Sequence, residues 1–458
     1  MQVPKTHAVT AHLARVVAEL APGALSDADL DKAALCYADW FAVAVAASHE
    51  NAIAMLREYA AAEGGAPVAS FLGTRMRGTV AQAALINGAA SHFYDYDDVS
   101  QGWLGHPTVP VASAVWALAE REGVDGPSAL TALIAGVEVS GRLGRALGVE
   151  HYRRGWHSSS TIGAIGAAAG CASLLRLDAQ QTTIALGLAA TRAAGLQVVF
   201  GTAAKPLQLA HAAQVGLNSA ELARRGFTCA TDALEGASGF LALHADGYDP
   251  ALLVAPPSSL PCIHDTVFKH HAACFGTHAP IEAAKRLRAR TGFDCESIER
   301  IVLCASRETN AICRNPCPRT GLESKFSAPF AVALALTGHD TAALSTFSDE
   351  MTSVPQLQAL AARVEMVADP SLEPTTAVLI LRMKDGTVQS IAASSASTCG
   401  DPSRRPEEIR RKALALCRPV LGERAAHMID SILDLRRGRL PDLRPGKASR
   451  STGRAAQA

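Results

Sequence analysis

Up to about residue 260 the chain is a succession of segments in which apolar residues recur at helical spacing. Glycine, proline and aspartate separate these segments, and Gly226 stands where a helix C-cap is expected. No strand-like alternation of apolar and polar residues interrupts the succession. The pattern predicts helices at 26–47, from Pro107 or Pro110 onward, and at 127–147, 159–174, 178–190 and 206–225.

The pattern changes after this point. Alternating residues predict strands at 297–305, 361–367, 378–383 and 387–392. The dipeptide Asp385-Gly386 lies between the last two strands and suits a hairpin turn. Helices are predicted beside these strands at 277–291 and 325–337, and again at 405–435.

A chain of 458 residues exceeds the size at which a single hydrophobic core stops growing. We therefore expect a mainly α protein in which a smaller α+β domain is inserted into a large all-helical domain. The expected boundaries are 1–265 plus 401–440 for the helical domain and 266–400 for the α+β domain. Residues 441–458 are expected to form a disordered tail.

Composition and charge exclude several classes of partner. The 43 basic residues balance the 43 acidic ones, so no overall field attracts nucleic acid or a membrane surface. The Ala- and Gly-rich stretch 158–175 carries Ser and Thr, and it predicts a buried helix, not a membrane span. Basic residues gather only near the end of the chain, where a solvated face explains them: Arg404, Arg405, Arg410, Arg411 and Lys412.

The cysteines favour neither a disulfide framework nor a metal site. The eleven cysteines are scattered, and the first residues lack the apolar region of a secretion signal, so we expect reduced thiols and a cytoplasmic protein. Cys313 and Cys317 have a spacing that suits zinc, but no second ligand pair follows. No Cys-x-x-Cys motif and no Gly-x-Gly-x-x-Gly motif occurs. We therefore expect neither a metal nor a cofactor.

Two polar stretches precede predicted helices in the first half of the chain. The first runs from His92 through the acids Asp95, Asp97 and Asp98 to His106. Its acids could simply cap a helix, or one acid could orient or accept a proton while His106 faces a carboxylate at the helix N-terminus. The second contains His157, Ser158 and Ser159, whose hydroxyls and backbone amides could bind a carboxylate or merely cap the helix.

Two further stretches carry cations ahead of helices. Thr202 and Lys205 precede Pro206, so the lysine and the helix dipole could clamp an anion, although an exposed lysine is the alternative. The segment 269–278 begins with Lys269 and ends with His278, and the imidazole suits acid–base chemistry near neutral pH. Cys274 within it is interpreted as a small apolar filler. Together the four stretches predict a metal-free cleft for several carboxylates.

The order and spacing of these motifs resemble the MmgE/PrpD family, which includes 2-methylcitrate dehydratase, cis-aconitate decarboxylase and iminodisuccinate epimerase. The resemblance runs from about residue 34 to 435. The residues that carry it are 86–90 with His92 and 95–98, Gly105-His106-Pro107, Gly155-Trp156-His157, Gly201-Thr202 with Lys205-Pro206, 269–278, and Lys325-Phe326-Ser327.

The resemblance implies a large helical domain, a smaller α+β lid domain, a homodimer and a cleft between the domains. It implies that the active-site residues are Asp95, His106, His157, Lys205 and His278, with Lys269 as a further candidate. Three positions depart from the family pattern. Val99 stands where Thr is frequent, Gln208 where His is frequent, and His271 where an aromatic residue is common.

We therefore expect a metal-independent lyase that removes the proton alpha to a carboxylate of a small di- or tricarboxylic acid. Lys205, Lys269, Ser158, Ser159 and Thr202 are expected to hold the substrate, with the imidazoles and Asp95 acting on protons. The alternatives are an epimerase of an iminodisuccinate-type acid, a non-catalytic carboxylate-binding scaffold, and a metal-dependent hydrolase that uses the histidines.

Overall fold

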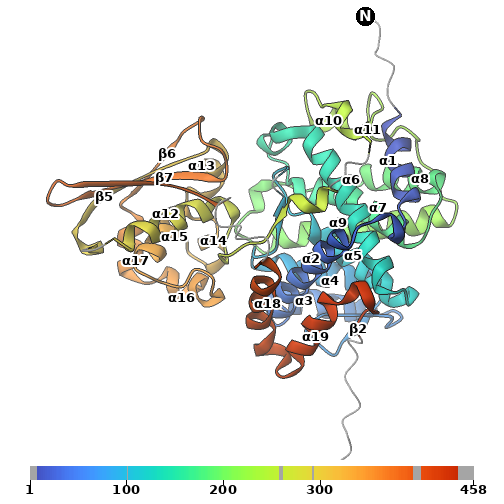
Figure 1. The fold of residues 1–458 in the computed structure, drawn as a ribbon, viewed down its shortest axis with the longest axis horizontal. Helices are drawn as coiled ribbons and strands as arrows, with labels where there is room; N and C mark the ends of the chain where they lie inside the picture. Colours follow the sequence, from blue (N-terminus) through green and yellow to red (C-terminus); the bar gives the residue numbers. More distant parts are fainter. Residues whose placement is uncertain (1–7, 101, 257–260, 291–292, 396–403, 442–458) are drawn as a thin grey trace, which may run out of the picture.

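The computed structural model describes residues 8–100, 102–256, 261–290, 293–395 and 404–441. Figure 1 shows two groups of elements side by side. The helical group, on the right, contains α1–α11, α18 and α19, and the α+β group, on the left, contains α12–α17 with strands β5–β8. The mainly α fold class is therefore confirmed.

The helices predicted in the first part of the chain are present, with ends that their caps define. Ser26, Thr79 and Asp178 each accept a hydrogen bond from the third residue of the helix they precede, in capping boxes. The bounds are α1 (Val9–Glu19), α2 (Asp27–Ala46), α3 (Asn51–Glu63), α4 (Val80–Phe93), α5 (Thr108–Glu122), α6 (Gly126–Arg153), α7 (Ser158–Leu174), α8 (Ala179–Ala190), α9 (Ala204–Arg224), α10 (Phe240–His244) and α11 (Pro250–Val254).

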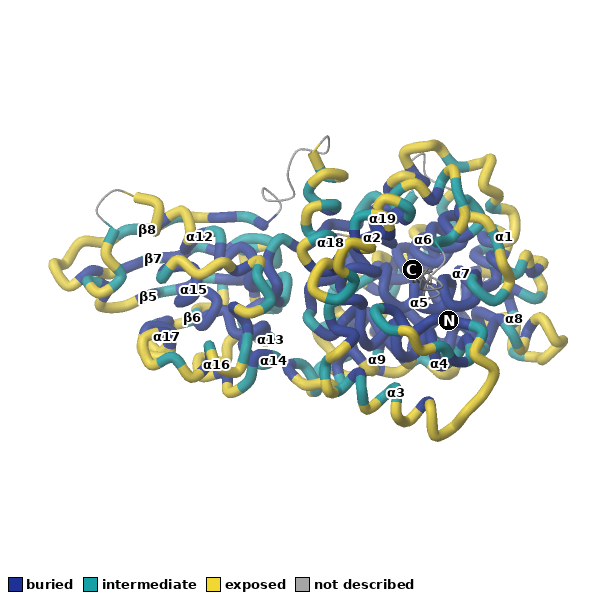
Figure 2. The backbone as a smooth tube through the Cα atoms, turned by 90° about the horizontal axis from the view of Figure 1, so that it is seen from below, coloured by how far each residue is buried: buried dark blue, intermediate teal, exposed yellow. Residues whose placement is uncertain are grey.

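Helix α7 forms the centre of the helical group and packs mainly against α6 and α9. Figure 2 shows that the chain is buried through α5 and α7. Small residues allow this close packing. A Cβ added to Gly166 would lie 1.9 Å from Oγ of Ser140 and 2.9 Å from the carbonyl oxygen of Gly136, both on α6.

The prediction that no strand interrupts the helical half was wrong. Strands β1 (Ala69–Ser70) and β2 (Arg77–Gly78) pair with each other, and β3 (Val99–Ser100) pairs antiparallel with β4 (Thr266–Val267). Each strand has two residues, which is too short for an alternation to be visible in the sequence. The β3–β4 pair has a functional consequence, since it places the acidic run 95–98 beside the segment that leads to 269–278.

The α+β group is built on a four-stranded sheet with the order β6-β5-β7-β8. All neighbours are antiparallel except β5 and β6. The predicted strands and hairpin are confirmed, and Gly386 in the hairpin has a φ of 85°. The bounds are α12 (His278–Arg288), β5 (Ile298–Ala305), α13 (Arg307–Cys313), α14 (Gly321–Ser324), α15 (Ala328–Leu336), α16 (Asp349–Thr352), α17 (Pro355–Ala361), β6 (Val364–Ala368), β7 (Thr376–Met383) and β8 (Val388–Ser394).

The C-terminal helical stretch returns to the helical group, where α18 (Arg405–Leu421) packs on α2. Gly422, with a φ of 55°, separates α18 from α19 (Arg424–Leu433). Lys412 does not lie on a solvated face as expected, because its Nζ is 2.7 Å from Oδ1 of buried Asp39 and donates to the carbonyl oxygen of Tyr96. The domain boundaries stay a prediction, and the expected tail lies, from residue 442 on, outside the described residues.

Within the described parts of the chain, no helix is both long enough and apolar enough to cross a membrane.

Candidate active site

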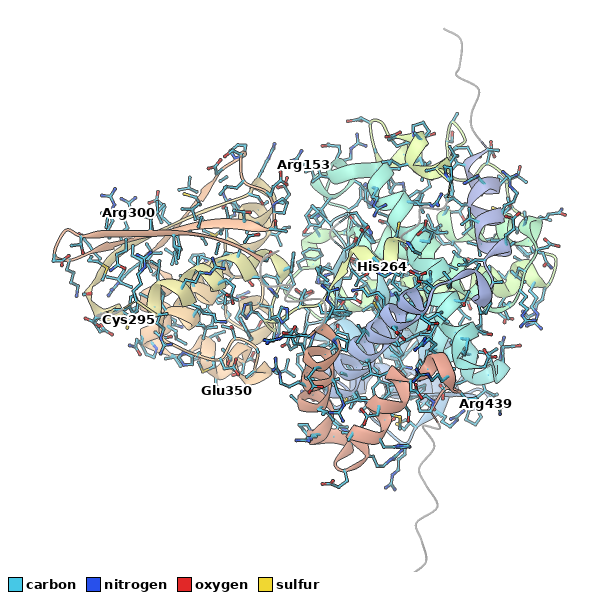
Figure 3. All side chains as sticks on the ribbon, in the orientation of Figure 1. Arg153, His264, Cys295, Arg300, Glu350 and Arg439 are labelled. Carbon is cyan, nitrogen blue, oxygen red and sulfur yellow. The ribbon has the colours of Figure 1, made fainter. Side chains whose placement is uncertain are left out.

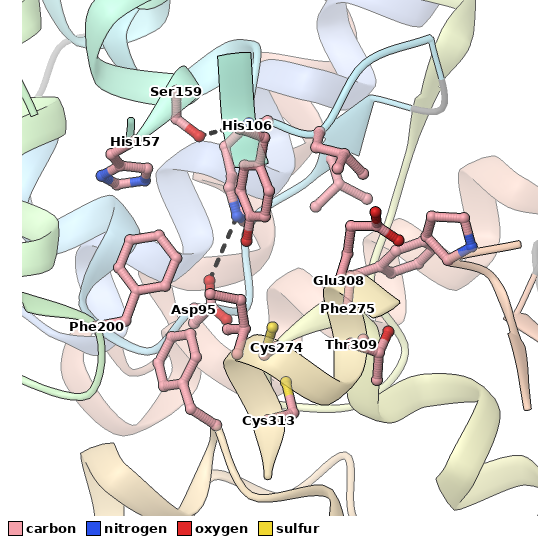
Figure 4. A pocket seen from close by; sticks show the side chains of 18 of the residues that line it. Asp95, His106, His157, Ser159, Phe200, Cys274, Phe275, Glu308, Thr309 and Cys313 are labelled. Atoms are coloured by element: carbon pink, nitrogen blue, oxygen red, sulfur yellow. Dashed lines mark hydrogen bonds and ion pairs between the residues drawn. The ribbon is translucent and has the colours of Figure 1, made fainter. Parts of the chain in front are cut away.

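A cavity of about 110 Å³ lies between the two groups of elements (Figure 4). The helical group supplies its charged and imidazole side chains, and the α+β group supplies thiols, a carboxylate and aromatic rings. The residues lining it include Asp95, His106, Tyr152, His157, Ser159, Phe200, Lys205, Cys274, Phe275, Glu308, Thr309, Ile312, Cys313 and Phe326. The motifs at 95–106, 157–159 and 205 therefore meet at one place, as the sequence predicted.

Asp95 organises the cations beside this cavity. It adopts a left-handed backbone conformation with a φ of 51°, which is strained for a residue that is not glycine. Its Oδ1 accepts a hydrogen bond from Nζ of Lys205 at 2.8 Å and lies 3.2 Å from Nζ of Lys269. Burial opposes its ionisation, but the two ammonium groups outweigh burial and hold the pKa of Asp95 well below its usual range. Asp95 is therefore a permanent carboxylate.

His106 is oriented by Asp97. Its Nδ1 lies 2.8 Å from Oδ2 of Asp97, while its Nε2 lies 3.4 Å from Oδ1 of Asp95 on the cavity side. The dashed line between His106 and Asp95 in Figure 4 marks the second contact. Burial lowers the pKa of His106, and the Asp97 carboxylate offsets only part of this. A neutral ring with its proton on Nδ1, 2.8 Å from the Asp97 carboxylate, keeps a lone pair on Nε2, which is what a general base requires.

His92 connects Asp97 to Lys205. Its Nδ1 lies 2.9 Å from the Asp97 carboxylate, and its Nε2 accepts a hydrogen bond from Nζ of Lys205 at 2.7 Å. Burial lowers the pKa of His92 to about 4, so the ring is neutral. The ammonium of Lys205 is thus fixed between His92 and Asp95, and it also lies 5.1 Å from the ring centroids of Phe200 and Phe326.

His157 precedes α7 and presents a second neutral imidazole to the cavity. Its Nδ1 lies 2.7 Å from Oε1 of Gln208, which can only accept, so the proton stands on Nδ1. Burial, with the charge of Lys205 adding to it, lowers the pKa of His157 well below its usual value. Gln208, which departs from the family pattern, therefore serves to orient this ring.

The other predicted residues lie around this cluster. Ser159 lines the cavity and accepts a hydrogen bond from the backbone N–H of His106 at 3.0 Å. Ser158 is buried in the first turn of α7, and Thr202 is exposed in the turn before α9; neither is among the residues that line the cavity. Lys269 lies behind Asp95 and donates to its carbonyl oxygen at 2.6 Å.

His278 is buried beside the cavity without lining it. Its Nε2 lies 3.4 Å from the carbonyl oxygen of Ala273, and its ring contacts that of His271. Burial lowers the pKa of His278 well below its usual value. A direct role in proton transfer would therefore require movement of the 269–278 segment.

Several residues that hold the site side chains in place, or line the cavity beside them, had no role predicted from the sequence. Asp97 and His92 were visible in the polar run, but their bridging position depends on the fold. Lys325 is buried, donates to the carbonyl oxygen of Ala272 at 2.5 Å, and has its pKa lowered to about 7 by burial. Tyr152 and Glu308 carried no signal in the sequence. Glu308 accepts two hydrogen bonds from Arg153 at the end of α6 that faces the α+β group (Figure 3).

Four of these side chains are close enough together to be considered as metal ligands. His92, Asp95, Asp97 and His106 offer atoms within 4.8 Å of one another. However, the ammonium of Lys205 already contacts His92 and Asp95, and Asp97 is engaged by two imidazoles. A cation held at hydrogen-bond distance from two of the four donors would repel a metal ion. The donor set therefore fits an ion poorly.

The chain belongs to the MmgE/PrpD family. Residues 11–253 match the MmgE/PrpD N-terminal domain, and residues 271–435 match the C-terminal domain. The family resemblance seen in the sequence is thereby confirmed.

Individual relatives carry the name cis-aconitate decarboxylase. The chain is 31% identical to the human protein over 324 residues, which is 66% of each chain. It is 30% identical over 300 residues to a cis-aconitate decarboxylase-like protein of Aspergillus oryzae, and 28% identical over 306 residues to the Aspergillus terreus protein, covering 61% and 62% of each chain. The similarity thus covers slightly less than two thirds of each relative's length.

Proposed function

We propose that the protein is a lyase that removes the proton alpha to a carboxylate of a small di- or tricarboxylic acid, without a metal ion. One observation carries the proposal. A neutral imidazole, His106, lies beside Asp97 so that its Nε2 is on the side of a small cavity, 3.4 Å from Oδ1 of Asp95 and beside the fixed ammonium of Lys205. The names of the relatives support the lyase class, since each is called a decarboxylase.

The reaction begins with His106 as the base. Its Nε2 takes the alpha proton, and the resulting imidazolium is stabilised by the Asp97 carboxylate at 2.8 Å. Negative charge then develops on the substrate carboxylate as an enolate-like species. The ammonium of Lys205 is held in place before the reaction, so it can stabilise that charge without reorganisation.

The second proton step distinguishes the possible reactions. Lys205 is the group we assign to deliver a proton, because the imidazole of His157 is held neutral with its proton directed at Gln208. Delivery to a leaving hydroxyl makes the enzyme a dehydratase. A decarboxylase would form the enolate-like species by losing carbon dioxide in place of the alpha proton, and Lys205 would then deliver its proton to carbon. His157, on the same cavity, supplies a second base, and this observation favours epimerisation as the second candidate function.

A substrate panel tests the proposal. The purified chain would be incubated with 2-methylcitrate, citrate, cis-aconitate and iminodisuccinate, and products would be identified by mass. A lyase releases water or carbon dioxide from one of these acids, whereas an epimerase leaves the mass unchanged. Binding of an acid without any product would instead support the non-catalytic scaffold.

Two controls make the panel decisive. A His106→Gln variant should lose the activity, whereas His427→Gln, at an exposed position on α19, should keep it. Activity that a chelator abolishes would favour the metal-dependent hydrolase and contradict our proposal. The homodimer and the cytoplasmic location stay predictions.

A further inference from the structure

The α+β wall of the cavity carries two cysteines that the proposed reaction does not use. Cys274 lies just before the 3-10 turn η4 (Phe275–Thr277), and Cys313 is the last residue of α13. Both line the cavity, both are free thiols, and their sulfur atoms are neighbours (Figure 4). Thirty-nine positions of sequence separate them, so the pairing is a product of the fold.

The backbone around the pair is fixed. The N–H of Cys274 donates to the carbonyl oxygen of Lys325 at 3.0 Å, and the N–H of Thr277 donates to the carbonyl oxygen of Cys274 at 2.9 Å. A Cβ added to Gly276 would lie 3.2 Å from Oγ1 of Thr309 and 3.4 Å from Sγ of Cys313. Helix α13 therefore packs directly on the η4 turn, which keeps the two sulfur atoms together.

The two thiols differ in character. The neighbouring thiol of Cys313 lowers the pKa of Cys274. Burial and the Asp95 carboxylate oppose this, and the ammonium groups of Lys269 and Lys205 add to it. The thiol of Cys274 in turn raises the pKa of Cys313 well above its usual value. Thiols that react with oxidants generally combine thiolate character with a neighbouring cysteine that can complete a disulfide. Cys274 fits the first role and Cys313 the second.

We propose that Cys274 and Cys313 form an oxidation site that a hydroperoxide converts to a disulfide in the wall of the cavity. The Cys274 thiolate attacks the peroxide oxygen, the O–O bond breaks, and a sulfenic acid and water are formed. The sulfur of Cys313 then attacks the sulfenic sulfur and displaces the second water. Two thiols and one hydrogen peroxide thus give one disulfide and two waters, and a dithiol reductant reverses the change.

Oxidation would act on the cavity through α13. Glu308, Thr309 and Ile312 lie on this helix and line the cavity. Glu308 also accepts hydrogen bonds from Arg153 of the helical group. Drawing Cys313 onto Cys274 shifts this wall, so the oxidised protein should bind a carboxylate ligand differently from the reduced one. This changes the interpretation of Cys274, which the sequence suggested was only a filler.

Peptide mapping of the full-length chain tests the proposal independently of any enzymatic activity. The reduced protein would be treated with an equimolar amount of hydrogen peroxide, its remaining thiols alkylated, and its peptides mapped without reduction. We expect one linked pair of peptides that contain Cys274 and Cys313, two hydrogens lighter than their sum, and separated again by dithiothreitol. Alkylation of both cysteines after peroxide treatment would overturn the proposal.

Single substitutions provide the controls. Cys313→Ser should leave Cys274 as a sulfenic acid that dimedone labels, whereas Cys274→Ser should leave Cys313 fully alkylated. Cys317→Ser removes an exposed thiol only four positions from Cys313 and should leave the linked peptide unchanged. If Cys317 is instead the cysteine found linked to Cys274, the proposed pairing is wrong.

Discussion

Replacement of Asp97 by asparagine tests whether Asp97 orients His106, the proposed base, while leaving the side chains that line the cavity in place. The Asp97 carboxylate lies 2.9 Å from Nδ1 of His92 and 2.8 Å from Nδ1 of His106. An amide has one accepting oxygen, so it can keep one imidazole N–H and must present its NH₂ group to the other ring. Nε2 of His92 accepts from Nζ of Lys205, so His92 keeps its proton on Nδ1, and the NH₂ group faces His106. His106 then carries its proton on Nε2 and loses the lone pair that removes the substrate proton.

The expected magnitudes follow from these contacts. Loss of a positioned acid–base group reduces turnover by about 10²–10⁴-fold. Loss of one hydrogen bond to a charged group destabilises the fold by about 1.5–3 kcal/mol. Asp97 is not among the residues that line the cavity, so KM should change little while kcat falls. Steady-state kinetics with the acid identified by the panel measures the first effect, and urea unfolding measures the second.

Asp98→Asn is the matched control in the same loop. Asp98 accepts a hydrogen bond from Oγ1 of Thr108 at 2.5 Å, and burial raises its pKa to about 8. The side chain is therefore largely protonated at neutral pH, and an amide replaces it with little change of charge. If Asp97→Asn retains the kcat of the unsubstituted protein, or if Asp98→Asn loses as much, then Asp97 does not act by orienting His106.

Three further predictions concern the side chains that line the cavity, the buried carboxyl of Asp98, and the helix packing at Gly166. Lys205→Ala and His157→Ala should each lower turnover by roughly 10²-fold or more, and unchanged turnover in both would reject the assignment. Asp98→Asn should become more stable than the unsubstituted protein as the pH rises. The Asp98 carboxyl, whose pKa is raised to about 8, stabilises the fold fully below its unfolded pKa of about 4, and the unsubstituted protein loses this contribution, up to roughly 5 kcal/mol, between pH 4 and pH 8. Urea unfolding of both proteins at pH 4, 6 and 8 measures the difference in the free energy of unfolding. Gly166→Ala should destabilise the fold by about 1–3 kcal/mol, because the added Cβ would collide with Ser140. Gly247→Ala should not destabilise it, because the space around Gly247 is open. Equal unfolding midpoints for the two variants would contradict this packing argument.

Much of the helical fold could be predicted because its information is local. Apolar periodicity and caps such as Ser26 mark the helices within a few residues of their ends. The two-residue pair β3–β4 could not be predicted, because it joins positions 99–100 to 266–267 and no alternation is visible over two residues. Lys412 was misjudged for a similar reason, since its partner Asp39 lies far away in the sequence.

In the candidate site, too, local features could be predicted from the sequence, whereas contacts between distant residues could not. Asp95, His106, His157 and Lys205 were recognisable because polar side chains precede helix starts, where a packed core would not favour them. Their roles depend on contacts across more than a hundred residues, such as that of Lys205 with Asp95. The bridge that Asp97 forms, and the Cys274–Cys313 pair, have no signature in a single sequence because only tertiary packing brings their members together.

The most direct test of the account is the loss of the alpha proton of the substrate in D₂O, followed by NMR for the unsubstituted protein and for His106→Gln. We predict that the unsubstituted protein exchanges or removes this proton and that the variant does so at least about 10²-fold more slowly. An alpha-proton signal that persists with the unsubstituted protein while product forms, or that disappears equally fast with the variant, would contradict the claim that His106 is the base.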